Sequence, residues 1–237
     1  MSRALNTIHT SRTMMFKELR ALIDHQVFDE KSIVEMNILG KLSASGIKST
    51  LSYLSGLYDF KEKNQLWKVF LYLFEIAEES DRRIMTMLYA QYKDDLLRLS
   101  TSVVLNTPKG KKVATKALQE AVNKAYPERF APTTSLSAAQ NISSSWKQAG
   151  YIEGKIRSIR VPVEPNLPAV LFAFYLGHQD GLVGEDLLKT RWIGLLELSQ
   201  TQLHEYLTQA STQELIGYQK AGGITIIKLE DLINRIA

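Results

Sequence analysis

The chain has 237 residues, no cysteine and a formal net charge of +4. Without cysteine it has no disulfide, no thiolate nucleophile and no cysteine-ligated zinc site. Its longest apolar run, 169–176, is far shorter than the roughly 20 residues of a membrane-spanning helix. The N-terminus lacks the apolar segment of a secretory signal. We therefore expect a cytoplasmic protein that makes no membrane contact.

The first sixty residues predict a small helical head. The ranges with helical spacing of apolar residues are 12–24, 31–39 and 45–58. This head carries several cations and hydroxyls that could contact a nucleic-acid backbone: Arg12, Lys41, Lys48, Ser49 and Ser52. Solubilisation of the surface is the simpler explanation for them.

Two longer helices are predicted over 64–79 and 81–99. Apolar side chains cover much of the first, which is typical of a helix central to a core. The aromatic residues of these helices, among them Tyr89 and Tyr92 of the second, could stack on bases, but their spacing favours core packing. The sequence Asn106–Gly110 then breaks the helical pattern, so we expect an N-terminal helical domain over 1–106.

The next segment, 107–165, predicts a helix over 112–126, a turn, a second helix over 135–149 and a β-hairpin. Ser135 or Ser137 would begin the second helix, and Gly150 would end it. Extended runs on either side of Gly154–Lys155 predict a hairpin with a type II′ turn. This order is that of a winged helix.

The remaining segment, 166–237, is net acidic and predicts a helical C-terminal part with one short strand. Helices are expected over 169–177, 185–197, 200–209 and 212–221, a strand over 224–229 and a short final helix. Ser211 and Glu214 have the spacing of a capping box for the helix over 212–221. The predicted fold class is therefore mainly α, a helical protein with a winged-helix-like (helix-turn-helix plus β-hairpin) central portion.

Positive charge is concentrated in the middle of the chain. Between Thr107 and Arg160 ten cations face three carboxylates, a net charge of +7, so the remaining residues sum to −3. A local excess of this kind on a helix-helix-hairpin pattern indicates a surface for a polyanion. The alternative is a solvated basic face with no ligand.

Double-stranded DNA fits the types of side chain in this segment. The cations expected to reach phosphates are Lys109, Lys111, Lys112, Lys147, Lys155, Arg157 and Arg160. The small polar side chains expected to face base edges in the major groove are Ser137, Gln140, Asn141, Ser144 and Gln148. The lysines near residue 110 would lie at a helix N-terminus, where the helix dipole disfavours cations. They are therefore expected to bind an external anion.

Catalytic and metal-binding motifs are missing from the sequence. The histidines His9, His25, His178 and His204 lack the spacing of a metal or catalytic pair, and no phosphate-binding loop or nucleophile motif occurs. We expect no catalytic residue, no metal, no cofactor and no small-molecule substrate.

Three segments resemble the BrxA family of BREX bacteriophage-resistance systems. They are HTSRTMMFKELRALID, LSAAQNISSSWKQAGYIEGKIRSIRV and LHEYLTQAS followed by GGITIIKLEDL. The resemblance covers most of the chain by the order and size of its elements. It implies a non-enzymatic, mostly helical cytoplasmic protein that binds double-stranded DNA beside larger BREX proteins, including a methyltransferase, an ATPase and a phosphatase-like protein.

Three other functions stay open at this stage. The same fold would serve a winged-helix transcription regulator, which would protect a specific sequence in its own promoter. An RNA-binding helical protein would prefer single strands, because sequence-specific RNA recognition mostly uses unstacked bases. A scaffold protein would bind no nucleic acid.

Overall fold

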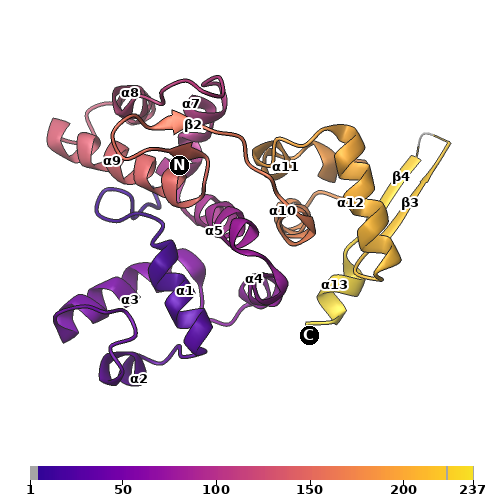
Figure 1. Cartoon of the computed structure of the whole chain (residues 1–237), viewed down its shortest axis with the longest axis horizontal. Helices are drawn as coiled ribbons and strands as arrows, with labels where there is room; N and C mark the ends of the chain where they lie inside the picture. The colour runs from indigo at the N-terminus through magenta and orange to yellow at the C-terminus, as the bar shows by residue number, and fades with distance from the viewer. Residues whose placement is uncertain (1–4, 223, 237) are drawn as a thin grey trace. The chain divides into compact units, whose positions relative to one another are not determined.

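The computed structural model describes residues 5–222 and 224–236, and its described part is mainly helical with two small antiparallel sheets (Figure 1). The mainly α fold class is thereby confirmed. Contacts divide the chain into two compact units: unit 1 comprises Met1–Asn64 and Tyr89–Val161, and unit 2 comprises Gln65–Leu88 and Pro162–Ala237. The chain crosses between units three times, so these units do not coincide with the three consecutive segments expected from the sequence.

Unit 1 contains most of the helices. They are α1 (Phe16–His25), α2 (Glu30–Glu35), α3 (Ala44–Tyr58), the end of α5 (Glu79–Lys93), α6 (Asp95–Leu99), α7 (Thr101–Leu105), α8 (Thr115–Ala125) and α9 (Pro132–Gln148). The single helix predicted over 81–99 is wrong, because the chain breaks at Asp94. Its backbone is extended, and its carboxylate accepts the N–H of Leu97 at 2.9 Å to cap α6.

Helix α9 begins at Pro132 and not at Ser135 or Ser137. Proline at the first turn has a backbone angle suited to a helix and lacks an N–H that would go unpaired there. Ser135 is instead buried within the helix, where its Oγ accepts the side-chain N–H of Gln119 from α8 at 3.0 Å. Trp146 is fully buried on the same helix and donates its indole N–H to Ser100 Oγ at 2.7 Å.

A three-stranded arrangement follows α9. Strands β1 (Ile152–Glu153) and β2 (Ile159–Arg160) pair in antiparallel fashion, and Lys112 bridges to Ile159 on the other side of β2. The chain at 111–113 is thus extended and precedes α8. Gly150 has φ of +86° after the helix, as expected of a C′ residue. The two-residue turn is wrong, because the connection between the strands runs over 154–158.

Residues 6–16, which we call the N-terminal strap, bind to α6 and to one face of α9. His9 is fully buried, with Nδ1 2.8 Å from Asp94 Oδ2 and Nε2 2.9 Å from Ser145 Oγ. The N–H groups of Ile8 and Met14 donate to Asp94 and to Ser145 at 2.7 and 2.8 Å. Nothing in the hydrophobic periodicity of the sequence predicted this segment's path.

The carboxylate of Asp94 anchors the strap. Burial disfavours its ionised form, but the charge and hydrogen bond of His9, with the N–H groups of Leu97 and Ile8, outweigh that cost. The pKa of Asp94 is therefore lowered from its ordinary value. The ionised carboxylate consequently stabilises the folded state.

Unit 2 is built around an apolar helix pair. Its elements are α4 (Gln65–Ile76), the start of α5, α10 (Leu167–Gln179), the 3-10 helix η1 (Gly184–Lys189), α11 (Arg191–Leu195), α12 (Gln200–Thr212), β3 (Gly217–Ala221), β4 (Ile224–Lys228) and α13 (Glu230–Asn234). The rings of Phe70 in α4 and Phe172 in α10 lie 5.4 Å apart, and both are buried. The aromatic residues of α4 therefore serve core packing, as predicted.

The C-terminal part differs from its prediction in several elements. The single helix expected over 185–197 is wrong, because η1 and α11 divide this range. The helix expected over 212–221 is wrong, and this range instead enters β3, which pairs with β4 from Gly217–Lys228 to Ala221–Ile224. Two strands thus replace the single predicted one. The capping box belongs to α12, where Ser199 and Gln202 exchange hydrogen bonds, and not to Ser211 and Glu214.

Among the described residues, no helix is both long and apolar enough to cross a membrane.

Replacing Asp94 with Ala should destabilise the protein by about 3–5 kcal/mol, because it leaves the buried His9 without its partner. Asp24→Ala is the matched control. It removes an exposed i,i+4 pair with Arg20 that is worth only about 0.3–0.5 kcal/mol. Urea unfolding at neutral pH measures both differences, and equal losses in the two variants would contradict the anchoring role.

The same pair should show a defined pH dependence. The folded-state pKa of Asp94 lies below the unfolded value of about 3.9. Its contribution is therefore full at neutral pH and is lost as pH falls through the folded pKa. We expect the stability difference between the native protein and Asp94→Ala to shrink on acidification. A difference that grows as pH falls would show that the carboxylate is not the stabilising form.

Candidate nucleic-acid interface

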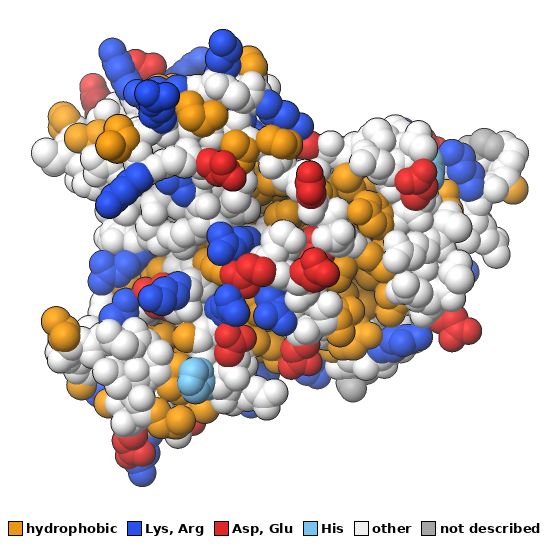
Figure 2. All heavy atoms as spheres, viewed as in Figure 1, with side chains coloured by type: hydrophobic (Ala, Val, Ile, Leu, Met, Phe, Trp, Pro, Cys, Tyr) orange, Lys and Arg blue, Asp and Glu red, His pale blue; other side chains and the backbone are white. Residues whose placement is uncertain are grey.

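Five cations lie on the chain that forms and flanks the three-stranded arrangement of unit 1. This basic surface consists of Lys109, Lys111, Lys112, Lys155 and Arg157, and all five are exposed. Hydrogen bonds from Arg160 N to Lys111 O and from Val113 N to Ser158 O, at 2.8 and 2.9 Å, join the lysine-bearing segment to the hairpin. Figure 2 shows Lys and Arg side chains gathering over α8, α9 and β2.

The position of the first three lysines corrects one part of the sequence argument. Helix α8 begins at Thr115, so Lys111 and Lys112 precede it in extended backbone and do not occupy its first turn. The predicted conflict with the helix dipole therefore does not arise. Both side chains are exposed, whereas Val113, which follows them, is buried in the core.

Lys147 links α9 to the connection between β1 and β2. It is half-buried near the end of α9, and its Nζ donates to the backbone carbonyl of Lys155 at 3.2 Å. This bond fixes the hairpin tip relative to α9. Lys147 thus contributes charge beside the tip but does not project from it.

Arg160, predicted to contact phosphate, is fully buried, which makes this prediction wrong. Its guanidinium donates to the carbonyls of Tyr151, at 3.1 Å, and Val161. The group also lies over the ring of Tyr151, 5.1 Å from its centroid. The side chain therefore ties the base of the hairpin together and is inaccessible to a ligand.

The polar face of α9 is only partly available for base contacts. Asn141 donates to His9 O at 2.9 Å, and Gln148 accepts the N–H of Phe16 at 3.0 Å and donates to Thr13 Oγ1 at 2.9 Å. These two residues were predicted to face base edges, but the N-terminal strap occupies them.

The other three residues predicted to face base edges, Ser137, Gln140 and Ser144, do not hold the N-terminal strap as Asn141 and Gln148 do. Ser144 is half-buried, whereas Ser137 and Gln140 are exposed. The accessible polar surface of α9 is therefore confined to its N-terminal half, and the predicted reading face is smaller than the sequence indicated.

The cations of the helical head have partners within the protein. Lys41 pairs with Glu18 at 2.8 Å and Lys48 with Glu30 at 3.4 Å. The guanidinium of Arg12 lies over the ring of Tyr53, 5.1 Å from its centroid. These contacts favour a structural or solubilising role for the head and not a second nucleic-acid site.

Net charge separates strongly between the two units. Unit 1 holds 21 cations against 12 carboxylates, a net charge of +9, and unit 2 holds 8 against 13, a net charge of −5. The positive charge that would attract a polyanion is therefore concentrated in unit 1. The +7 found over Thr107–Arg160 is most of that charge.

Ser145, His9 and Asp94 have the hydrogen-bond order of a nucleophile, a base and an acid. All three are buried to within 1% exposure, and Ser145 Oγ already accepts the N–H of Met14 and donates to Asn141 O at 3.0 Å. A nucleophile must reach a substrate, so this arrangement serves to hold the strap. Within the described ranges, no group of three His, Cys, Asp or Glu side chains is arranged to hold a metal ion.

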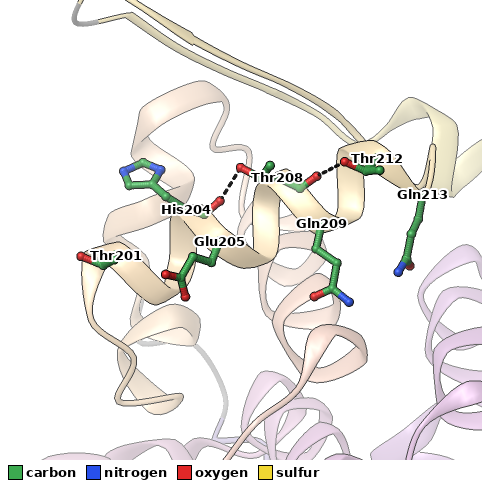
Figure 3. A pocket seen from close by; sticks show the side chains of 7 residues that line it. All are labelled: Thr201, His204, Glu205, Thr208, Gln209, Thr212 and Gln213. Atoms are coloured by element: carbon green, nitrogen blue, oxygen red, sulfur yellow. Dashed lines mark hydrogen bonds between the residues drawn. The ribbon is translucent and has the colours of Figure 1, made fainter.

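A shallow groove runs along α12 in unit 2 (Figure 3). The hydroxyls of Thr208 and Thr212 donate to the carbonyls of His204 and Thr208, at 2.8 and 3.0 Å, and are thus engaged within the helix. Glu205 adds a negative charge to this groove. A polyanion is disfavoured here by the carboxylate and by the −5 charge of the unit.

No protein-family model, curated protein or solved structure matches this chain. The site is therefore assigned from the geometry and charge of its own residues, and the BrxA resemblance stays a prediction.

Arg160→Met should destabilise the protein by about 1–3 kcal/mol, because the carbonyls of Tyr151 and Val161 lose the guanidinium, and only Tyr151 O keeps another donor, the N–H of Val161. Arg157→Met removes an exposed guanidinium from the same hairpin and should change the free energy of unfolding by less than about 0.5 kcal/mol. Denaturant unfolding of both variants tests the difference. Equal stability would contradict the structural role of Arg160.

Proposed function

We propose that this protein binds double-stranded DNA through the basic surface of unit 1, without catalysing a reaction on it. The observation that carries the proposal is the bridge between Lys112 and Ile159 of β2, which joins the lysine-bearing segment before α8 to the hairpin that carries Lys155 and Arg157. Exposed cations on two segments joined in this way suit the phosphates of a duplex, which supply a large share of the affinity in such complexes.

The order of elements in unit 1 supports a winged-helix assignment. Helix α7, the extended segment at Lys112, helices α8 and α9 and the β1–β2 hairpin follow one another, with β2 central among three paired segments. In a helix-turn-helix module the second helix, here in the position of α9, enters the major groove.

Sequence preference is expected to be weak. The strap occupies Asn141 and Gln148, so only Ser137 and Gln140 offer exposed polar groups from the predicted reading face. Phosphate contacts set position and affinity, whereas base contacts set specificity. We therefore expect binding that depends strongly on salt and little on sequence.

The BrxA resemblance supplies the biological setting of the proposal. A non-enzymatic duplex-binding protein would serve as an accessory of a BREX phage-defence assembly in the cytoplasm, beside other BREX proteins. The charge segregation between the units is compatible with this setting, because the acidic unit 2 stays available to a partner that is not a polyanion.

Reversing the two tip cations tests the proposal directly. The double variant Lys155→Glu, Arg157→Glu should weaken binding to a 30-base-pair duplex by at least tenfold and make the log–log salt slope less negative by about 1.8, at about 0.9 per phosphate contact. The matched control is Lys61→Glu, Lys63→Glu, which changes the charge equally at two exposed positions away from the basic surface. Fluorescence anisotropy across a salt series measures both.

Equal losses in the two double variants would mean that net charge alone attracts the DNA. If the native protein binds no duplex at low salt, the proposal is wrong, and the scaffold function, which involves no nucleic acid, is favoured. Thermal melts of the variants serve as the folding control, since all four side chains are exposed.

The remaining alternatives differ in the nucleic acid that they prefer. A transcription regulator would protect one sequence against excess non-specific duplex. An RNA-binding protein would bind single-stranded RNA more tightly than duplex DNA. The proposal predicts the opposite order, with duplexes of unrelated sequence bound within about threefold of one another because few base contacts are available.

A further inference from the structure

Ile156 lies at the tip of the β1–β2 hairpin, with 89% of its surface exposed. Its two neighbours in the chain are Lys155 and Arg157, which are also exposed. Burying this side chain against a ligand would be favourable, because its apolar surface would leave water. Among the exposed large hydrophobic residues of the described chain, Ile156 is the one with a cation on each side.

The tip that carries Ile156 is held on several sides. Lys147 donates to Lys155 O, and Val113 donates to Ser158 O. Gly154 and Ser158 close the loop with positive φ of +85° and +51°, and Ser158 is buried. The apolar side chain is thus presented by a supported loop whose ends are fixed to the body of unit 1.

Proteins that kink DNA insert an apolar side chain between base steps from the minor groove, while nearby cations bind the groove. A narrow minor groove has an enhanced negative potential that attracts arginine and lysine. The sequence Lys155-Ile156-Arg157 combines both features in three consecutive residues. Its exposure, charge and support match the requirements of such an insertion.

We propose that Ile156 is a wedge that enters the minor groove of duplex DNA and partly unstacks one base step, with Lys155 and Arg157 binding the groove and phosphates on either side. This inference rests on the proposed function and specifies how the hairpin engages the duplex. Flexible pyrimidine–purine steps, such as TA, are the sites where the insertion costs least.

The test uses the full-length protein and a duplex with one central TA step in which the adenine is 2-aminopurine. The native protein should increase the fluorescence of that base and bring dyes at the duplex ends closer together. Ile156→Ala should abolish both signals and weaken binding about tenfold, since the side chain no longer leaves water. Ile156→Phe should retain both signals.

The matched control is Leu42→Ala, which removes another fully exposed aliphatic side chain from unit 1. It should behave as the native protein does. Because both positions are exposed, neither substitution to Ala is expected to alter the thermal melt.

Two results separate this inference from the function on which it rests. Duplex binding with the same bend and fluorescence in Ile156→Ala as in the native protein would overturn the wedge and leave DNA binding intact. A native protein that fails to bind the duplex would overturn both. Loss of the fluorescence signal on adding distamycin, which occupies the minor groove, would support the assigned groove, and an unchanged signal would contradict it.

Discussion

The pairing of residues 111–113 with β2 is the contact on which the proposed interface depends. Without it, Lys111 and Lys112 would belong to a loop before α8, and the hairpin would be a two-stranded ribbon with few backbone bonds. The bridge on the other side of β2 joins the segment before α8 to the hairpin, and a hairpin is more stable with further pairing than as an isolated two-stranded unit. The buried Arg160 completes it by satisfying carbonyls at the base of the hairpin. Arg160 thus stabilises the hairpin on which the exposed cations Lys155 and Arg157 lie.

The N-terminal strap sets a second constraint, because it covers part of the face of α9 that would otherwise read bases. Asp94 holds the strap through His9, and Ser145, Asn141 and Gln148 hold it to α9. Releasing these side chains for base contacts would expose the buried His9–Asp94 pair to water. The stability that the pair provides would then be lost. The covered half of α9 therefore serves the fold. The proposed interface must then recognise a duplex by its phosphates, by groove shape and through the exposed end of α9.

Sequence patterns predicted what depends on local periodicity. The apolar stripe of α9 and the stop at Gly150 follow from residues close in the chain, and α3, predicted over 45–58, runs from Ala44 to Tyr58. The failures have long-range causes. The sequence predicts Arg160 to be a surface cation, because nothing near it in the pattern indicates that it bonds to the carbonyls of Tyr151 and Val161. Likewise, it predicts Asn141 to be exposed, because the residue to which its amide donates lies 132 residues away in the chain. Ile156 could have been noticed, since an apolar residue between two cations in a turn is visible in the sequence. Its exposure was not predicted, because Gly154–Lys155 indicated a two-residue turn and the strands are instead connected by the five residues 154–158.

The path of the chain between the two units changes how the acidic part can be studied. The net acidic C-terminal segment suggests the hypothesis that it masks the basic face or docks a basic partner, and deleting residues 169–237 is the test that the sequence alone suggests. Unit 2 also contains 65–88, and Phe70 in α4 packs on Phe172 in α10. Such a deletion would strip the partner from an apolar helix, and any change in DNA binding would follow from that exposure as well as from lost charge. Substituting exposed carboxylates such as Glu185, Glu205 and Glu230 by glutamine removes the charge and keeps the core. The effect of unit 2 on the duplex is then separable from its effect on the fold.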